Sequence, residues 1–124
     1  MSNKGIYATI IVKNIEKSMV FYTEEMNFFV KNRDFGMGNI RLTYCKNDLF
    51  GFFLQEDKNY EPPPHPILTI YTNNIKEEYD RFKNLSFNSG GYLLSKNGLF
   101  EYPAGESFTL IDPSGNKIII EKEF

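Results

Sequence analysis

The sequence predicts an α+β fold made of two tandem modules, each running strand, helix, strand, strand, strand. Three observations predict it: an internal repeat, a helical stripe inside each repeat, and strand-like segments after each stripe. Residues 7–15 match residues 67–75, sixty positions later. We therefore expect a single domain, 1–124, with a first module at 1–60, a Pro-rich connector at 61–66 and a second module at 67–124. Halves of this size are too small to be stable separately.

The helix of each module follows directly on its first strand. Asn14 and Asn74 are predicted to cap the two helices, because a short polar side chain accepts from free N–H groups of the first turn. Glu77, three residues after Asn74, strengthens the second cap. The apolar stripes recur at helical spacing, at Ile15, Met19, Tyr22 and Met26 in the first module and at Ile75, Tyr79 and Phe82 in the second.

Aromatic and branched residues then predict three strands per module, about eight strands in all. The segments are 28–34, 40–45 and 50–55, then 92–95, 107–111 and 117–123. A tight turn is expected at 112–116, which reads Asp-Pro-Ser-Gly-Asn. Alternation in the first strand places Ile6, Ala8, Ile10 and Val12 under the helix, and Tyr7, Thr9 and Ile11 on the opposite, mixed face.

Charge and cysteine content exclude several classes of protein. Fourteen Lys and Arg against sixteen Asp and Glu give a formal net charge of −2, which argues against a nucleic-acid partner. Cys45 is the one cysteine, so no intrachain disulfide is expected and a buried apolar role is favoured for it. No apolar run is long enough for a membrane span, and we expect a cytoplasmic protein with no membrane partner.

The mixed faces predict a small-molecule site, because aromatic and apolar side chains with a few polar groups are typical of such sites. If the two modules set these faces together, their sheets curl into an open cup. On the mixed face, Arg41 would bind a carboxylate or phosphate through two hydrogen bonds, or would form an ordinary surface ion pair with Asp or Glu. Glu121 is either an acid of the cavity or part of a solvated tail. The predicted ligand-binding residues are Tyr7, Thr9, Arg41, Phe53, Ile67, Tyr71, Thr109, Ile119 and Glu121.

Two stretches resemble the vicinal oxygen chelate superfamily, which includes glyoxalase I, fosfomycin resistance proteins, extradiol dioxygenases and bleomycin resistance proteins. They are residues 12–22, with the Phe21-Tyr22 pair, and residues 108–118, with the Asp-Pro-Ser-Gly-Asn turn. The resemblance spans nearly the whole chain and implies the glyoxalase/bleomycin resistance fold and a homodimer. It also implies four divalent-metal ligands, at positions held here by Tyr7, Phe53, Ile67 and Ile119. None of these is a usual ligand of such an ion.

The chain is thus closest in character to the metal-free, bleomycin-resistance-like members. We expect no cofactor and a role in binding or sequestering a small, partly aromatic molecule, cationic or planar, rather than catalysis. The alternative is a divalent-metal-dependent lyase or isomerase of the glyoxalase I type, which would hold Ni, Zn or Mn through displaced ligands at Gln55, His65 and Glu121. His65 lies between two prolines and is otherwise an exposed connector residue. A third reading is an interaction module whose cup is filled by its own Phe and Tyr side chains.

Overall fold

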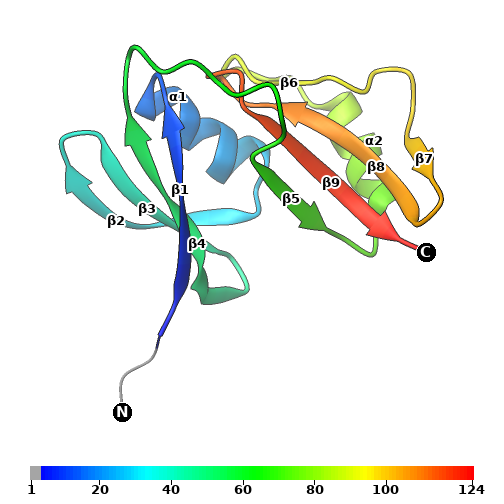
Figure 1. Cartoon of the computed structure of the whole chain (residues 1–124), viewed down its shortest axis with the longest axis horizontal. Coiled ribbons are helices and arrows are strands. Elements are labelled where there is room, and N and C mark those ends of the chain that lie inside the picture. The colour runs from blue at the N-terminus through cyan, green and yellow to red at the C-terminus, as the bar shows by residue number, and fades with distance from the viewer. Residues whose placement is uncertain (1–3) are drawn as a thin grey trace. The chain divides into compact units, whose positions relative to one another are not determined.

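A computed structural model describes residues 4–124 as two compact units, the first ending at Tyr60 and the second beginning at Glu61. Each unit contains one mixed, open sheet and few helical residues, which confirms the predicted α+β class (Figure 1). That their faces enclose a common cup stays a prediction.

The first unit contains four strands in the order β1-β4-β3-β2, with β1 parallel to β4 and the other pairs antiparallel. The elements are β1 (Ile6–Val12), α1 (Ile15–Met19), η1 (Val20–Glu25), β2 (Phe29–Gly36), β3 (Asn39–Tyr44) and β4 (Asn47–Glu56). Asn14 caps α1 as predicted, since its side chain accepts from the N–H of Lys17 at 2.9 Å. The predicted single helix instead continues as a π-helix, η1, which buries Phe21 and Tyr22.

The helical segment covers one face of this sheet. Phe52 of β4 is 1% exposed, and its ring lies 5.1 Å from that of Tyr22 and 4.6 Å from that of Phe29. The prediction that all of Ile6, Ala8, Ile10 and Val12 pack under the helix is wrong for the first two. Ile10 and Val12 are buried, whereas Ile6 is 71% exposed and Ala8 is exposed, because the short helical segment does not cover the start of β1.

The second unit contains β5 (Leu68–Tyr71), α2 (Ile75–Asn84), β6 (Tyr92–Leu93), β7 (Phe100–Tyr102), β8 (Gly105–Ile111) and β9 (Lys117–Glu123). The sheet order is β5-β9-β8-β6, with β5 parallel to β9, and β7 also pairs with β8. The prediction of about eight strands omitted β7. Among residues 4–124 the structure has nine, because the segment after β6 returns to pair beside β8.

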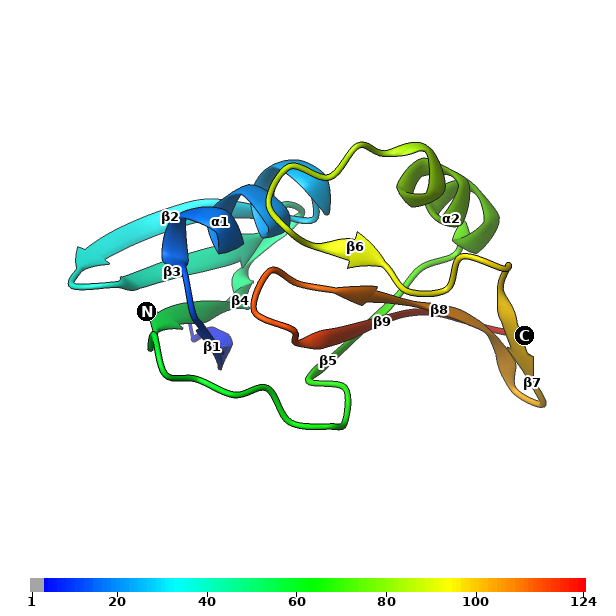
Figure 2. The same cartoon turned by 90° about the horizontal axis from the view of Figure 1, so that it is seen from above.

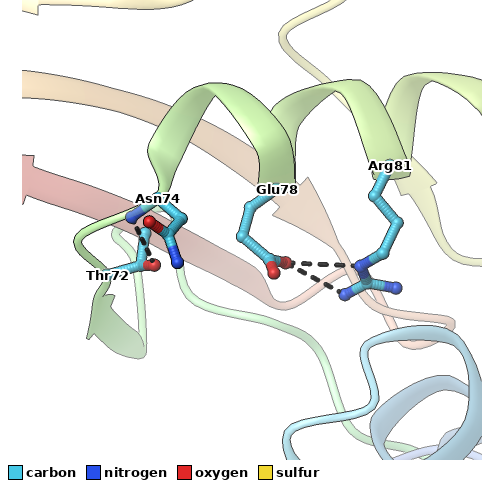
Figure 3. A network of polar contacts seen from close by, with 4 residues as sticks. All are labelled: Thr72, Asn74, Glu78 and Arg81. Atoms are coloured by element: carbon cyan, nitrogen blue, oxygen red, sulfur yellow. Dashed lines mark hydrogen bonds and ion pairs between the residues drawn. The ribbon is translucent and has the colours of Figure 1, made fainter.

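The helix α2 lies over one face of this sheet (Figure 2). Its predicted stripe is confirmed, since Ile75, Tyr79 and Phe82 are all buried and Tyr79 packs 5.4 Å from the Phe108 ring. Asn74 occupies the cap position, but its side chain makes no capping bond. Its backbone N–H instead donates to the hydroxyl of Thr72 at 3.1 Å (Figure 3).

The predicted turn joins β8 to β9 through buried polar groups. The Asp112 carboxylate accepts from the N–H groups of Ser114 and Asn116 and from the Asn116 side-chain amide, at 2.8, 2.9 and 2.9 Å. Gly115 has a φ of +91°, and a Cβ there would meet Pro62 of the connector at 2.9 Å. The turn therefore sets the register of the two strands that carry Thr109, Ile119 and Glu121.

Two further observations concern predictions from composition. Within residues 4–124, no helix is long and apolar enough to cross a membrane. Cys45 is exposed, so the prediction of a buried role is wrong; it lies just after the end of β3, beyond the covered part of the sheet.

Candidate functional site

Each sheet has an open face, which we define as the face that the helix of its own unit does not cover. In β4, Phe52 and Leu54 are buried under the helix, so Phe53 between them lies on the open face. In β8 and β9, Phe108, Leu110, Ile118 and Ile120 are buried under α2, so the residues that alternate with them lie on the open face. Most of the predicted ligand-binding residues lie on these two faces.

On the open face of the first unit, the structure brings together Tyr7, Thr9, Arg41 and Phe53. Phe53 is the register partner of both Thr9 in β1 and Arg41 in β3. The rings of Tyr7 and Phe53 meet edge to face at 5.8 Å. The guanidinium carbon of Arg41 lies 5.5 Å from the centre of the Tyr7 ring and 5.9 Å from that of Phe53. Arg41 therefore forms cation–π contacts with both rings.

Sequence reasoning missed Phe35, at the end of β2. Its ring lies 5.4 Å from the Arg41 guanidinium and 6.0 Å from the Phe53 ring, and its side chain is 45% exposed. The predicted strand ends at residue 34, one position before Phe35, whereas β2 continues to Gly36; its β-bulges also break the simple alternation from which faces are assigned.

On the open face of the second unit, Thr109, Ile119 and Glu121 line a pocket of about 470 Å³. Thr109 and Ile119 are register partners across β8 and β9, and Glu121 pairs with Ser107. The Thr109 N–H donates to the Ser95 hydroxyl at 3.0 Å. The full lining is Ser95, Phe100, Tyr102, Ser107, Phe108, Thr109, Ile119 and Glu121. Glu121 is the one charged residue of this described lining.

Strand β7 adds the aromatic wall of this pocket. The rings of Phe100 and Tyr102 stack 6.4 Å apart with an angle of 14° between their planes. Sequence reasoning missed both. The alternation of Phe100, Glu101 and Tyr102, with two aromatic residues on one face, is the signal that would have placed them.

The carboxylate of Glu121 is bound by a tyrosine hydroxyl group. Tyr102 donates a hydrogen bond to Glu121 Oε1. This hydrogen bond, with burial and the charge of Glu121, raises the pKa of Tyr102 from 10.0 to about 12. A hydrogen bond to Glu121 and its negative charge likewise raise the pKa of Tyr71, the register partner of Glu121 in β5. Both phenols therefore stay protonated at neutral pH, and Tyr102 donates to the acid.

Two predicted residues of the second unit lie outside this pocket. Tyr71 is 61% exposed and lines a neighbouring hollow of about 300 Å³ with Thr72, Asn73 and Glu123. Ile67 precedes β5, where its N–H donates to the carbonyl of Lys117 at 3.0 Å. Ile67 thus forms a backbone hydrogen bond at the edge of the sheet and does not line the pocket.

The positions at which the resemblance implies metal ligands do not supply a suitable donor set. Phe53, Ile67 and Ile119 have no donor atom in their side chains, and the hydroxyl of Tyr7 donates to the backbone carbonyl of Asp48 at 2.7 Å. Within residues 4–124, no three His, Cys, Asp or Glu side chains are grouped so as to hold a metal ion. These residues therefore do not fit the divalent metal ion that the resemblance implies.

In the alternative interpretation three other side chains would hold the metal ion. Each of them is either already hydrogen-bonded or exposed to solvent. Glu121 accepts from Tyr102, as described above. His65 is exposed, with Nδ1 3.0 Å from the carbonyl oxygen of Pro66. Gln55 is exposed on β4, in the other unit.

Comparison with known proteins places this geometry in a family. UcmS2 has the same fold, with a TM-score of 0.72 at 17% identity over 98% of both chains. TnmS3, an antibiotic binding protein from Streptomyces sp. CB03234, gives 0.71 at 18% identity over the whole of both chains. The fosfomycin resistance protein FosX from Listeria monocytogenes gives 0.70 at 13% identity, covering 100% of this chain and 94% of its own. No curated protein matches the chain. The model of one family matches residues 6–120, and the chain therefore belongs to the Glyoxalase/Bleomycin resistance protein/Dioxygenase superfamily.

Proposed function

We propose that this chain binds a small, partly aromatic cation on the open face of its second unit, without a metal ion, and so sequesters it. The observation that carries the proposal is the placement of Glu121, one carboxylate in a pocket walled by the stacked rings of Phe100 and Tyr102. A carboxylate attracts a cation, and ring faces add stacking and cation–π attraction.

The pocket suits one small ligand in size and polarity. Its volume of about 470 Å³ lies in the range of small-molecule sites. The hydroxyl groups of Ser95, Ser107 and Thr109 provide polar contacts beside the rings. Ser95 already accepts from the backbone of Thr109 and is thus held in position. Preorganised groups lose less entropy when the ligand binds.

Members of the same fold support a binding role. TnmS3 is described as an antibiotic binding protein and FosX as a fosfomycin resistance protein. Identities of 18% and 13% carry the fold alone, so the ligand class here rests on Glu121 and the aromatic wall.

The test compares 2-naphthylmethylammonium with its neutral analogue 2-naphthylmethanol. The chain contains no Trp, so naphthalene fluorescence can be excited beyond the absorption of tyrosine. The cation should bind more tightly. Glu121→Gln should weaken it about tenfold, since an ion pair in a half-exposed site contributes about 1 to 4 kcal/mol.

The matched control is Glu101→Gln, which removes the same charge one residue from Tyr102 but outside the pocket lining. It should leave the affinity nearly unchanged. Equal affinity for the cation and the alcohol, or an equal effect of the two substitutions, would overturn the assignment of the pocket.

Metal independence and a homodimer belong to the same proposal. Native mass spectrometry after incubation with Ni, Zn or Mn should give the dimer mass without stoichiometric metal. One ion bound per subunit would instead support the lyase or isomerase alternative, with Gln55, His65 and Glu121 as ligands to be tested by substitution.

A further inference from the structure

Two guanidinium groups lie opposite each other on the open face of the first unit. Arg33 in β2 and Arg41 in β3 are direct register partners. Within residues 4–124, no carboxylate lies within 4.0 Å of either side chain. Like charges placed opposite each other on neighbouring strands destabilise a sheet. A bound anion would relieve this repulsion.

Arg41 is held in a fixed position by its neighbours. Its Nε donates to the side-chain oxygen of Asn32 at 2.8 Å, and the rings of Tyr7, Phe35 and Phe53 lie within 5.9 Å of its guanidinium carbon. The side chain is half-buried. Its two terminal nitrogens have no acceptor among the described residues, so they remain available to a ligand as a pair of parallel donors.

Phe35 connects the two cations. Its ring centre lies 4.8 Å from the guanidinium carbon of Arg33 and 5.4 Å from that of Arg41. Because 45% of its side chain is exposed, part of this ring remains open to contact. Charge and exposed aromatic surface therefore occur side by side.

We propose that this cluster, formed by Asn32, Arg33, Phe35, Arg41 and Phe53, binds an aromatic carboxylate. The carboxylate accepts two hydrogen bonds from the terminal nitrogens of Arg41, Arg33 adds a second positive charge, and the ligand's ring packs against Phe35. The inference rests on the proposed binding role in one respect, that the open sheet faces are the ligand-binding surfaces. The first unit would thus bind an anion, whereas the second unit is proposed to bind a cation.

Arg81 provides a matched control elsewhere in the chain. Its guanidinium also lies over an aromatic ring, that of Phe82, at 4.1 Å. Its Nε and Nη2, however, donate to Glu78 at 3.3 and 3.2 Å, so this arginine already has its carboxylate (Figure 3). Replacing it removes the same charge and a similar ring contact without removing an available pair of donors.

The experiment titrates the protein with 2-naphthoate and with neutral 2-naphthamide, followed by naphthalene fluorescence. The carboxylate should bind more tightly. Arg41→Gln should weaken it about tenfold or more, and Arg41→Lys should also weaken it, since an ammonium group lacks the planar pair of donors. Arg33→Gln should have a smaller effect, and Arg81→Gln should have none. Circular dichroism reports folding, and Arg41→Lys and Arg33→Gln carry the test if Arg41→Gln does not fold.

Several outcomes overturn the proposal. Equal affinity for naphthoate and naphthamide refutes recognition of the carboxylate, as does an Arg41→Lys protein that binds like the Arg81→Gln protein. If inorganic phosphate competes as strongly as naphthoate itself, the ligand's ring contributes nothing to binding, and the proposal of an aromatic ligand is refuted. Glu121→Gln should leave naphthoate binding intact and Arg41→Gln should leave binding of 2-naphthylmethylammonium intact, so failure of one site is distinguishable from failure of the other.

Discussion

The turn at residues 112–116 depends on one buried carboxylate, so Asp112→Ala tests how much this carboxylate stabilises the turn between β8 and β9. Asp112 is 1% exposed, and three hydrogen bonds from within the turn reach its carboxylate. Two of them, from the N–H groups of Ser114 and Asn116, reach Oδ1, and the third, from the Asn116 amide, reaches Oδ2. Ser114 and Asn116 are themselves buried, at 3% and 0% exposure.

The magnitude follows from these three donors. A buried donor left without its partner costs about 1 to 3 kcal/mol, so we expect the loss of all three bonds to cost at least about 3 kcal/mol. Asp112→Asn keeps an oxygen for both backbone N–H groups and loses one bond, so we expect about 1 to 2 kcal/mol for that variant.

The assay is unfolding in urea, monitored by circular dichroism. The free energies of unfolding are compared between variants whose free energy depends equally steeply on urea concentration. The control is Asp57→Ala, because Asp57 also accepts from a nearby N–H, that of Asn59 at 2.9 Å, but in an exposed turn. It should cost less than about 1 kcal/mol. An Asp112→Ala protein as stable as the Asp57→Ala protein would refute the argument that the buried bonds maintain the turn.

Three further predictions follow from the packing and from Glu121. Phe52→Ala should reduce the free energy of unfolding by about 3 to 5 kcal/mol, measured by the same urea titration, because the ring is buried between those of Tyr22 and Phe29. Gly51→Ala should cost about 3 kcal/mol, since its Cβ would lie 2.0 Å from the carbonyl oxygen of Leu42; a loss below about 1 kcal/mol would contradict this. The hydrogen bond from Tyr102 stabilises the fold below pH 10, the unfolded pKa, and its contribution is lost as pH rises through the folded pKa of about 12. Glu121→Gln should lower that pKa toward 10.0, and an unchanged phenolate absorbance titration, taken as the difference from Tyr102→Phe, would contradict it.

Local patterns were sufficient for most of the fold. The repeat, the stripe at Ile75, Tyr79 and Phe82, and the Asp-Pro-Ser-Gly-Asn turn are short-range features, and the structure contains all three. The errors occur where a distant contact decides the outcome. Strand β7 is three residues long and forms by pairing with β8, and Ile6 is exposed because the helical segment does not reach it.

The candidate sites divide in the same way. Alternation along single strands assigned Arg41 and Phe53 to one face and Thr109 and Ile119 to another, because side chains alternate strictly in regular strands. That reasoning did not find Phe35, which lies beyond the predicted end of a bulged strand. It also did not find Phe100 and Tyr102, which lie on a short strand that pairs with β8.

The sequence by itself determined the module repeat, the fold class and the chemical types present at the positions implied as metal ligands, since each of these depends on residue identity and local spacing. Only the tertiary structure decided that Glu121 is bound by Tyr102 inside an aromatic pocket and that Arg33 and Arg41 share the ring of Phe35. These contacts join residues on different strands. Strand register and bulges set which side chains meet there, and neither can be read from the order of residues along one strand.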